Sequence, residues 1–168
     1  MVAALASPVR AQSEVEAEPV MAAFVHRFTQ FVEWPETALV GSDELVICVA
    51  GSEEFLATLE GIVAGNELAG RSIVAREVRS PQNVAGCHVL FVSFLAARPG
   101  RFVEASRGLP VLTVGDSTEF LEAGGIIHLR IIDRRIRFAI DVAAANRAGL
   151  RLSSQLLDLA VEVRGADE

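Results

Sequence analysis

The two cysteines are the residues of this chain with the most specific chemistry. Cys48 lies in the apolar run LVICVA, residues 45–50, and Cys87 opens the apolar run CHVLFVSF, residues 87–94. In a reducing compartment two such cysteines are buried thiols. In an exported protein an even number of cysteines instead favours a disulfide, which across this span would stabilise the fold by about 4 kcal/mol. A bond requires the two runs to be neighbouring strands, and the sequence leaves this open.

Polar residues follow three of the predicted strands, at the positions where ligands gather in open α/β sheets. These candidates are Ser52, Glu53, Glu54, Ser93, Asp116 and Ser117. Asp116 is the most suggestive of catalysis, because an acid directly follows a buried strand. However, no second acid directly ends the first strand, and all 15 basic residues are arginine, so no lysine could neutralise a phosphoryl group. We therefore interpret Asp116 as the N-cap of a short helix.

The sequence lacks the motifs of other common chemistries. It contains no GxSxG elbow, GxGxxG turn or P-loop. The three histidines (His26, His88 and His128) lack HxH or HExxH spacing, and Cys87 and His88 are neighbours that would point to opposite faces of a strand. We therefore predict a non-enzymatic protein with no metal and no cofactor.

Composition indicates one folded, acidic domain. The chain has 168 residues, of which 51% are hydrophobic and 22% charged, so it can bury a sizeable core. A net charge of −7 argues against a nucleic-acid partner, because phosphate binding needs a basic face. No apolar run approaches the roughly 20 residues that cross a bilayer, so we expect no direct membrane insertion.

The first residues are similar to the end of a secretory signal. The segment MVAALA followed by Ser7 and Pro8 fits the end of an apolar region and a cleavage site, although the charged start and a longer apolar region are missing. We interpret residues 1–12 as a signal remnant left by a start codon placed too late, or else as a flexible alanine-rich tail. Residues 14–164 are expected to form a single domain.

Hydrophobic periodicity predicts a three-layer α/β fold with a largely parallel sheet flanked by helices, a C-terminal β-hairpin and two closing helices. A first helix begins near Pro19, carries the stripe Val20, Phe24, Phe28 and Phe31, and ends at Trp34. The stripe is expected in the core, with a partner groove as the alternative. Strands are predicted at 44–50, 71–78, 87–94 and 109–115, and hairpin strands at 126–132 and 136–140. Helices are predicted at 53–63, 101–107, 117–124, 142–148 and from 153 or 154 to 163.

Several stretches taken in order resemble the YfiR family of periplasmic regulators. They are FTQFVEWP (28–35), LVICVAG (45–51), LAGRSIV (68–74), CHVLFVS (87–93), VLTVGD (111–116), GGIIHL (124–129) and AAANRAGLRLSSQLLDLA (143–160). The resemblance covers about residues 20–163. It implies a periplasmic, non-enzymatic protein that binds and restrains an inner-membrane diguanylate cyclase or another membrane sensor. Restraint of a cyclase lowers cyclic di-GMP and biofilm formation.

The resemblance also implies a homodimer, and it places Cys48 and Cys87 where the family carries a cysteine pair. Redox coupling is therefore part of the expectation, although with only two cysteines the second disulfide of some relatives cannot form. The segment FAID at 138–141 departs from the family's expected FEIN, so no specific role is assigned to Asp141.

A candidate partner or ligand surface consists of Trp34, Asp116, Asn146, Arg147 and Arg151. Asn146 and the two arginines are by default a solvated helix face, and arginine is also favoured at interface hot spots. The alternative to a regulator is a small-molecule sensing domain that acts on a receptor or transporter. An enzyme without a recognisable motif is the third hypothesis. A regulator needs an exposed apolar or arginine-rich patch, whereas a sensor needs a concave pocket with a few polar groups.

Overall fold

The computed structural model describes the backbone of residues 9–166 and the side chains of residues 17–166. The predicted signal remnant or tail at 1–12 therefore falls largely outside the described residues, and its last four positions lie in the first helix, α1 (Val9–Phe28). In the described part, no helix is both long and apolar enough to cross a membrane.

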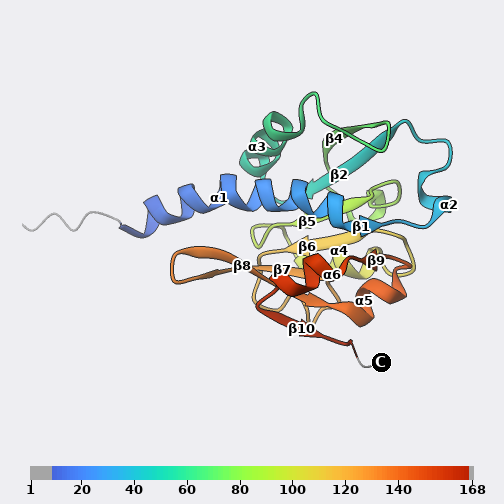
Figure 1. The fold of residues 1–168 in the computed structure, drawn as a ribbon. Helices are drawn as coiled ribbons and strands as arrows, with labels where there is room; N and C mark the ends of the chain where they lie inside the picture. Colours follow the sequence, from blue (N-terminus) through green and yellow to red (C-terminus); the bar gives the residue numbers. More distant parts are fainter. Residues whose placement is uncertain (1–8, 167–168) are drawn as a thin grey trace, which may run out of the picture.

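An eight-stranded sheet forms the centre of the molecule (Figure 1). Its order is β10-β8-β7-β6-β5-β2-β4-β3. Only the pairs β7–β8 and β3–β4 are antiparallel, which confirms the largely parallel α/β fold and the C-terminal hairpin. The strands are β2 (Glu44–Ala50), β3 (Glu67–Leu68), β4 (Arg71–Glu77), β5 (Val89–Val92), β6 (Leu112–Gly115), β7 (Ile127–Ile132), β8 (Arg135–Asp141) and β10 (Glu162–Arg164). A separate antiparallel pair joins β1 (Val32–Glu33) to β9 (Arg151–Leu152).

Two hydrophobic clusters fill the space on either side of the sheet. α1 and α3 (Glu53–Val63) lie side by side over one face, where Phe55, Leu59 and Val63 are buried at helical spacing. α4 (Pro99–Ala105) covers the other face through Phe102 and Val103. This is the predicted three-layer arrangement. The remaining helices are η1 (Thr29–Phe31), α2 (Glu36–Leu39), η2 (Pro81–Asn83), α5 (Val142–Arg147) and α6 (Ser154–Leu159).

The first helix differs from its prediction in length and in the face that it buries. It begins at Val9 and includes Pro19, which was expected to open it. Its buried face contains Met21, Val25 and Phe28, whereas Val20 is 44% exposed. The predicted buried stripe was therefore wrong at its first residue, because Met21 is buried in place of Val20. The orientation of the helix lets Phe28 pack edge-on against Phe138 of β8, with ring centroids 5.1 Å apart. Figure 1 shows the start of α1 projecting beyond the sheet on the side of the β7–β8 hairpin.

Two of the helix predictions for the C-terminal half of the chain were wrong. Residues 117–124 form turns rather than a helix capped by Asp116, and the ring of Phe120 fills the space above Gly115 and Gly125. The last helix ends at Leu159 instead of 163. The chain then becomes extended, and the N–H of Val161 donates to the carbonyl of Phe138, which starts the pairing of β10 with β8.

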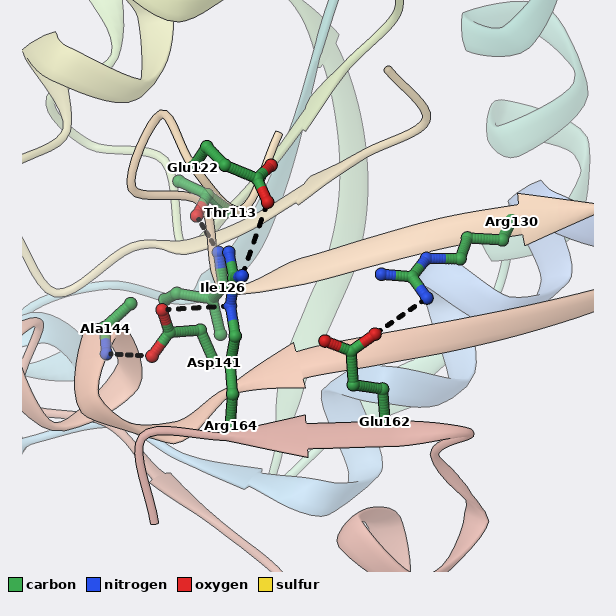
Figure 2. A network of polar contacts seen from close by, with 8 residues as sticks. All are labelled: Thr113, Glu122, Ile126, Arg130, Asp141, Ala144, Glu162 and Arg164. Atoms are coloured by element: carbon green, nitrogen blue, oxygen red, sulfur yellow. Dashed lines mark hydrogen bonds and ion pairs between the residues drawn. The ribbon is translucent and has the colours of Figure 1, made fainter. Parts of the chain in front are cut away.

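Charged side chains fasten β10 to the body of the protein (Figure 2). Glu162 pairs with Arg130 of β7 at 2.9 Å. Arg164 lies 3.3 Å from Glu122 and 3.7 Å from Asp141. Asp141, which received no role from the sequence, also caps α5 by accepting a hydrogen bond from the N–H of Ala144 at 3.0 Å. The last strand, the turn before β7 and the start of α5 are thus held together by one polar network.

Candidate functional site

A pocket of about 380 Å³ lies beyond the carboxyl ends of β2, β5 and β6. The chain crosses from β2 to β4 on one side and later returns to β5 on the other side of β2, so the strand order reverses between β2 and β5. Open α/β sheets bind ligands at such switch points, because the loops that follow the two strands diverge and leave a crevice. We call this the strand-end pocket. It is lined by Ala17, Glu18, Met21, Ser52, Glu54, Phe55, Phe91, Ser93, Phe94, Leu95, Asp116 and Ile131.

The polar side of the strand-end pocket is built by residues that the sequence placed at strand ends. Ser52 caps α3 by accepting a hydrogen bond from the N–H of Phe55, and its hydroxyl donates to Glu18 of α1 at 3.3 Å. Ser93 is buried, and its hydroxyl oxygen accepts a hydrogen bond from the N–H of Leu95. The carboxylate of Asp116 accepts one from the N–H of Phe94 at 2.8 Å. The structure therefore brings Ser52, Ser93 and Asp116 into one pocket.

A glycine lets two loops of this pocket meet. Gly51, directly after β2, has φ +91°, and a Cβ at this position would lie 2.6 Å from the backbone of Ala96 in the loop after β5. Only glycine combines a left-handed backbone with so close an approach. The loop that carries Phe94 and Leu95 is thereby seated against the end of β2.

The apolar side of the pocket continues onto the surface. Inside, the rings of Phe55 and Phe91 stack with centroids 3.8 Å apart and an interplanar angle of 6°. At the rim, Phe94, Leu95 and Ile131 are 59%, 64% and 52% exposed. We call these three residues the apolar rim. Large apolar side chains gathered at the mouth of a pocket are typical of an interaction site.

The strand-end pocket is acidic. Glu18, Glu54 and Asp116 line it, and no arginine or histidine is among its lining residues. Burial raises the pKa of the Asp116 carboxyl, and the nearby Glu18 adds to this, while the N–H of Phe94 acts in the opposite direction. A carboxylate that is costly to ionise, in a cleft without a cationic neighbour, favours a ligand that carries a positive charge. In the part of the chain that the structure describes, no group of three or more His, Cys, Asp or Glu side chains is arranged to hold a metal ion.

The two cysteines form a disulfide. It joins Cys48 of β2 to Cys87, 39 positions later and just before β5, with Cα atoms 5.8 Å apart. Both residues are buried in the cluster beneath α4. Because β2 and β5 are adjacent parallel strands, the bond closes the loop that contains α3, β4 and η2. Because both cysteines are buried, an external thiol has little access to this bond.

Trp34 lies in the core rather than on a partner surface. Its indole N–H donates to the carbonyl of His88 at 3.0 Å, and the two rings meet edge to face. His88 itself accepts a hydrogen bond from the N–H of Val46 at Nδ1 and lies 2.9 Å from the carbonyl of Ala38 at Nε2. These contacts assign the neutral Nε2–H tautomer. Trp34 and His88 are therefore a buried pair that fixes the start of the sheet, which no local pattern in the sequence reveals.

The other three predicted surface residues are exposed, but they lie away from Asp116. Asn146 and Arg147 end α5, and Arg151 lies in β9 opposite Glu33. Arg147 lines a second cavity together with Val111 and Thr113, at the beginning of β6, whereas Asp116 follows the end of that strand. The five residues therefore do not form one continuous surface.

Comparison with known proteins decides the family. A model of the YfiR/HmsC-like family matches residues 18–161, which include the sheet from β2 to β8 and every lining residue of the strand-end pocket except Ala17. The chain belongs to the YfiR/HmsC-like family. Members of this family are periplasmic regulators rather than enzymes.

One solved structure supports the fold. A conserved domain protein from Vibrio cholerae O1 biovar El Tor strain N16961 superposes with a TM-score of 0.55 at 13% identity, over 76% of this chain and 56% of the Vibrio chain. This chain thus spans little more than half the length of that relative. An ABC domain from Streptococcus pneumoniae in complex with L-Trp gives a TM-score of 0.47 at 15% identity, over 70% of this chain and 54% of the other, which is too weak to support an argument. The comparison with curated proteins gives no match.

Proposed function

We propose that this YfiR-like protein is a non-enzymatic periplasmic regulator that binds and restrains an inner-membrane diguanylate cyclase, and so lowers cyclic di-GMP and biofilm formation. Family membership over residues 18–161 supports the class of function. The observation that carries the proposal to this chain is the apolar rim, in which Phe94, Leu95 and Ile131 are each more than half exposed around a pocket. A protein that acts by contact needs such a surface.

The chemistry of the rim and pocket defines the partner surface that would fit. An apolar segment would cover Phe94 and Leu95, and a basic side chain beside it would enter the pocket near Asp116 and Glu18. The net charge of −7 disfavours binding to an anionic lipid surface. The protein would therefore contact the part of the cyclase that projects into the periplasm.

The disulfide supports export, because disulfides form and persist in oxidising compartments. We propose that redox coupling acts through folding. Reduction of a bond buried beneath α4 loosens the link between β2 and β5, instead of switching an exposed thiol. A reduced protein would then lose restraint of the cyclase because less of it is folded.

The homodimer is also a proposal, and β10 offers a surface for it. This strand is an outer strand of the sheet, with its polar side chains Glu162 and Arg164 held in ion pairs to the body. Leu159, Val161 and Val163 are exposed. A second copy could pair along the free edge and cover these side chains. The variant Val163→Arg should then be monomeric by light scattering under conditions where the wild type is a dimer.

The test of function is a complementation experiment in cells from which the gene has been deleted. The wild-type protein, exported by a complete signal sequence, should lower cellular cyclic di-GMP, and Leu95→Asp in the apolar rim should not. Val40→Asp is the matched control, because Val40 is 77% exposed and lies before the amino end of β2, remote from the pocket. Immunoblots of periplasmic extracts check that each variant is present in the same amount as the wild type. If Leu95→Asp lowers cyclic di-GMP as well as the wild type does, the rim is not the docking surface; if the wild type has no effect, the regulatory role itself fails.

A second candidate function is a periplasmic sensor of small molecules that acts on a receptor or transporter. The strand-end pocket favours it, because its volume, its stacked phenylalanine wall and its few polar groups are typical of a ligand site. A cationic aromatic amine such as tryptamine is a suitable probe. Saturable binding of tryptamine that is lost in Asp116→Asn, with no change in cyclic di-GMP on deletion of the gene, would favour this second function.

A further inference from the structure

A second cavity, of about 320 Å³, lies at the opposite end of the sheet from the strand-end pocket. It is lined by residues at the end of α4, at the start of β6, in the turn before β7 and at the end of α5. We call it the arginine cavity, because Arg107 and Arg147 both line it. The two residues come from different elements, one just after α4 and the other at the end of α5.

The arginine cavity is positively charged in a protein whose net charge is −7. No carboxylate is among its lining residues. Among side chains of residues 17–166, the ion pairs of arginine involve Arg79, Arg130 and Arg164, and not the two cavity arginines. The Arg107 guanidinium lies beside Gly124, where an added Cβ would be in ordinary van der Waals contact with it at 3.8 Å. Two guanidinium groups are therefore free to bind an anion.

The floor of the cavity is apolar, and the two hydroxyl oxygens that line it already take part in hydrogen bonds. Val103, Val111 and Ile126 are buried there. The hydroxyl of Ser106 donates to the carbonyl of Val103, and the hydroxyl oxygen of Thr113 accepts from the N–H of Ile126. A ligand would therefore make its polar contacts with the arginines at the mouth and apolar contacts with the floor.

We propose that the arginine cavity binds a small organic carboxylate with a compact apolar body. The carboxylate lies between the guanidinium groups of Arg107 and Arg147, whose planar donors match its two oxygens, and the apolar body rests on the floor formed by Val103, Val111 and Ile126. The cavity is of the size that holds small molecules. This inference stands independently of the regulatory role.

A simpler role for each arginine is to neutralise the carbonyl end of the helix that it follows or ends. That role makes each residue matter for stability and not for ligand binding. It also gives no reason for the two side chains to line one cavity of mainly apolar surface. The two explanations therefore differ in a measurable way.

The test uses benzoate as the probe, titrated into the full chain and followed by the backbone amide NMR signals of Thr113 and Ile126. Benzoate should bind saturably, and benzamide, which has nearly the same shape without the charge, should bind at least tenfold more weakly. Inorganic phosphate, which lacks the apolar body, should also bind at least tenfold more weakly. Arg107→Gln and Arg147→Gln should each weaken benzoate binding at least fivefold.

Arg101→Gln is the matched control, because Arg101 is an exposed arginine of α4 that does not line the cavity. Its affinity for benzoate should equal that of the wild type. Thermal unfolding followed by Trp34 fluorescence checks that each variant is folded. The proposal is overturned if benzoate does not saturate, if benzamide binds equally well, or if folded Arg107→Gln and Arg147→Gln variants bind benzoate like the wild type.

Discussion

The carboxylate of Asp116 accepts a hydrogen bond from the backbone N–H of Phe94, at 2.8 Å and across 22 positions of the chain. This contact ties the turn after β6 to the loop after β5, and that loop carries two of the three apolar rim residues. Asp116 thus both contributes to the acidity of the strand-end pocket and positions its exposed apolar mouth.

Replacement of Asp116 should separate these two contributions. Asp116→Asn keeps an oxygen that can accept the hydrogen bond and removes the charge that burial disfavours, so its free energy of unfolding at pH 7 should equal or exceed that of the wild type. Asp116→Ala loses the acceptor and should be destabilised by about 1 kcal/mol. Urea unfolding followed by Trp34 fluorescence measures both.

Asp116 should also make the free energy of unfolding depend on pH, in a direction that follows from its raised pKa. Because the folded-state pKa of Asp116 is raised above 3.8, the native state binds its proton more tightly than the unfolded state does. Its contribution to stability is therefore complete below pH 3.8 and is lost as the pH rises through the folded-state value. Asp116→Asn should lack this loss. A stability difference between wild type and Asp116→Asn that does not change between pH 3 and pH 7 would contradict this expectation.

His128 should act in the opposite direction. Burial lowers its pKa and the adjacent Arg130 adds to this, against smaller opposing effects of Glu122, the backbone at Asp116 and Glu162. The Nε–H of Arg130 also donates to Nδ1 of His128 at 3.1 Å, which requires that nitrogen to be unprotonated. The contribution of His128 to stability should therefore be complete above about pH 6.5, the ordinary pKa of histidine. It should be lost as the pH falls from there through the lowered pKa of the folded state.

His128→Gln isolates this effect from that of His26, whose pKa is also lowered by burial and by Arg27. The slope of unfolding free energy against pH between pH 5 and pH 7 should be smaller in His128→Gln than in the wild type. An unchanged slope would assign the pH dependence to other groups.

Reduction of the Cys48–Cys87 disulfide should lower the free energy of unfolding by about 4 kcal/mol, because the unfolded chain regains the freedom of a 39-residue loop. Equilibrium urea unfolding with and without a reductant measures the difference. A Cys48→Ala, Cys87→Ala double variant is the control and should be unaffected by the reductant. A wild-type protein whose unfolding midpoint is the same in both conditions would show that the bond contributes nothing to stability.

Gly51→Ala should be more damaging than Gly41→Ala. Both glycines have positive φ, +91° and +77°, so both substitutions introduce backbone strain of about 1 kcal/mol. Only at Gly51 does the new Cβ collide with backbone, that of Ala96, whereas no atom lies within 4 Å of a Cβ at Gly41. We expect an additional loss of about 1–3 kcal/mol for Gly51→Ala and a displaced apolar rim. Equal unfolding free energies of the two variants would show that the loops do not need this close approach.

The sequence by itself determined the elements whose signals are local. Residues 45–50 are apolar on both faces, which predicted a central strand at 44–50, and β2 has these bounds. Ser52 followed by two glutamates predicted the start of α3, because a cap bonds an N–H only three positions away. Asp133 and Arg134 turn the hairpin with positive φ at both positions, between the two strands that the sequence predicted. Each of these features depends on neighbours along the chain.

The tertiary structure decided every feature whose partner is distant in sequence. Asp116 has the sequence context of a helix cap, yet its carboxylate bonds an N–H on another strand's loop. The end of the predicted last helix became β10, because Phe138 offers a free carbonyl and Arg130, Glu122 and Asp141 receive its charged side chains. The strand order that places Cys48 beside Cys87, and Ser52 beside Ser93 and Asp116, is likewise set by the packing of whole helices against the sheet. Pairing energies between distant segments decide such contacts, and no local pattern in a sequence records them.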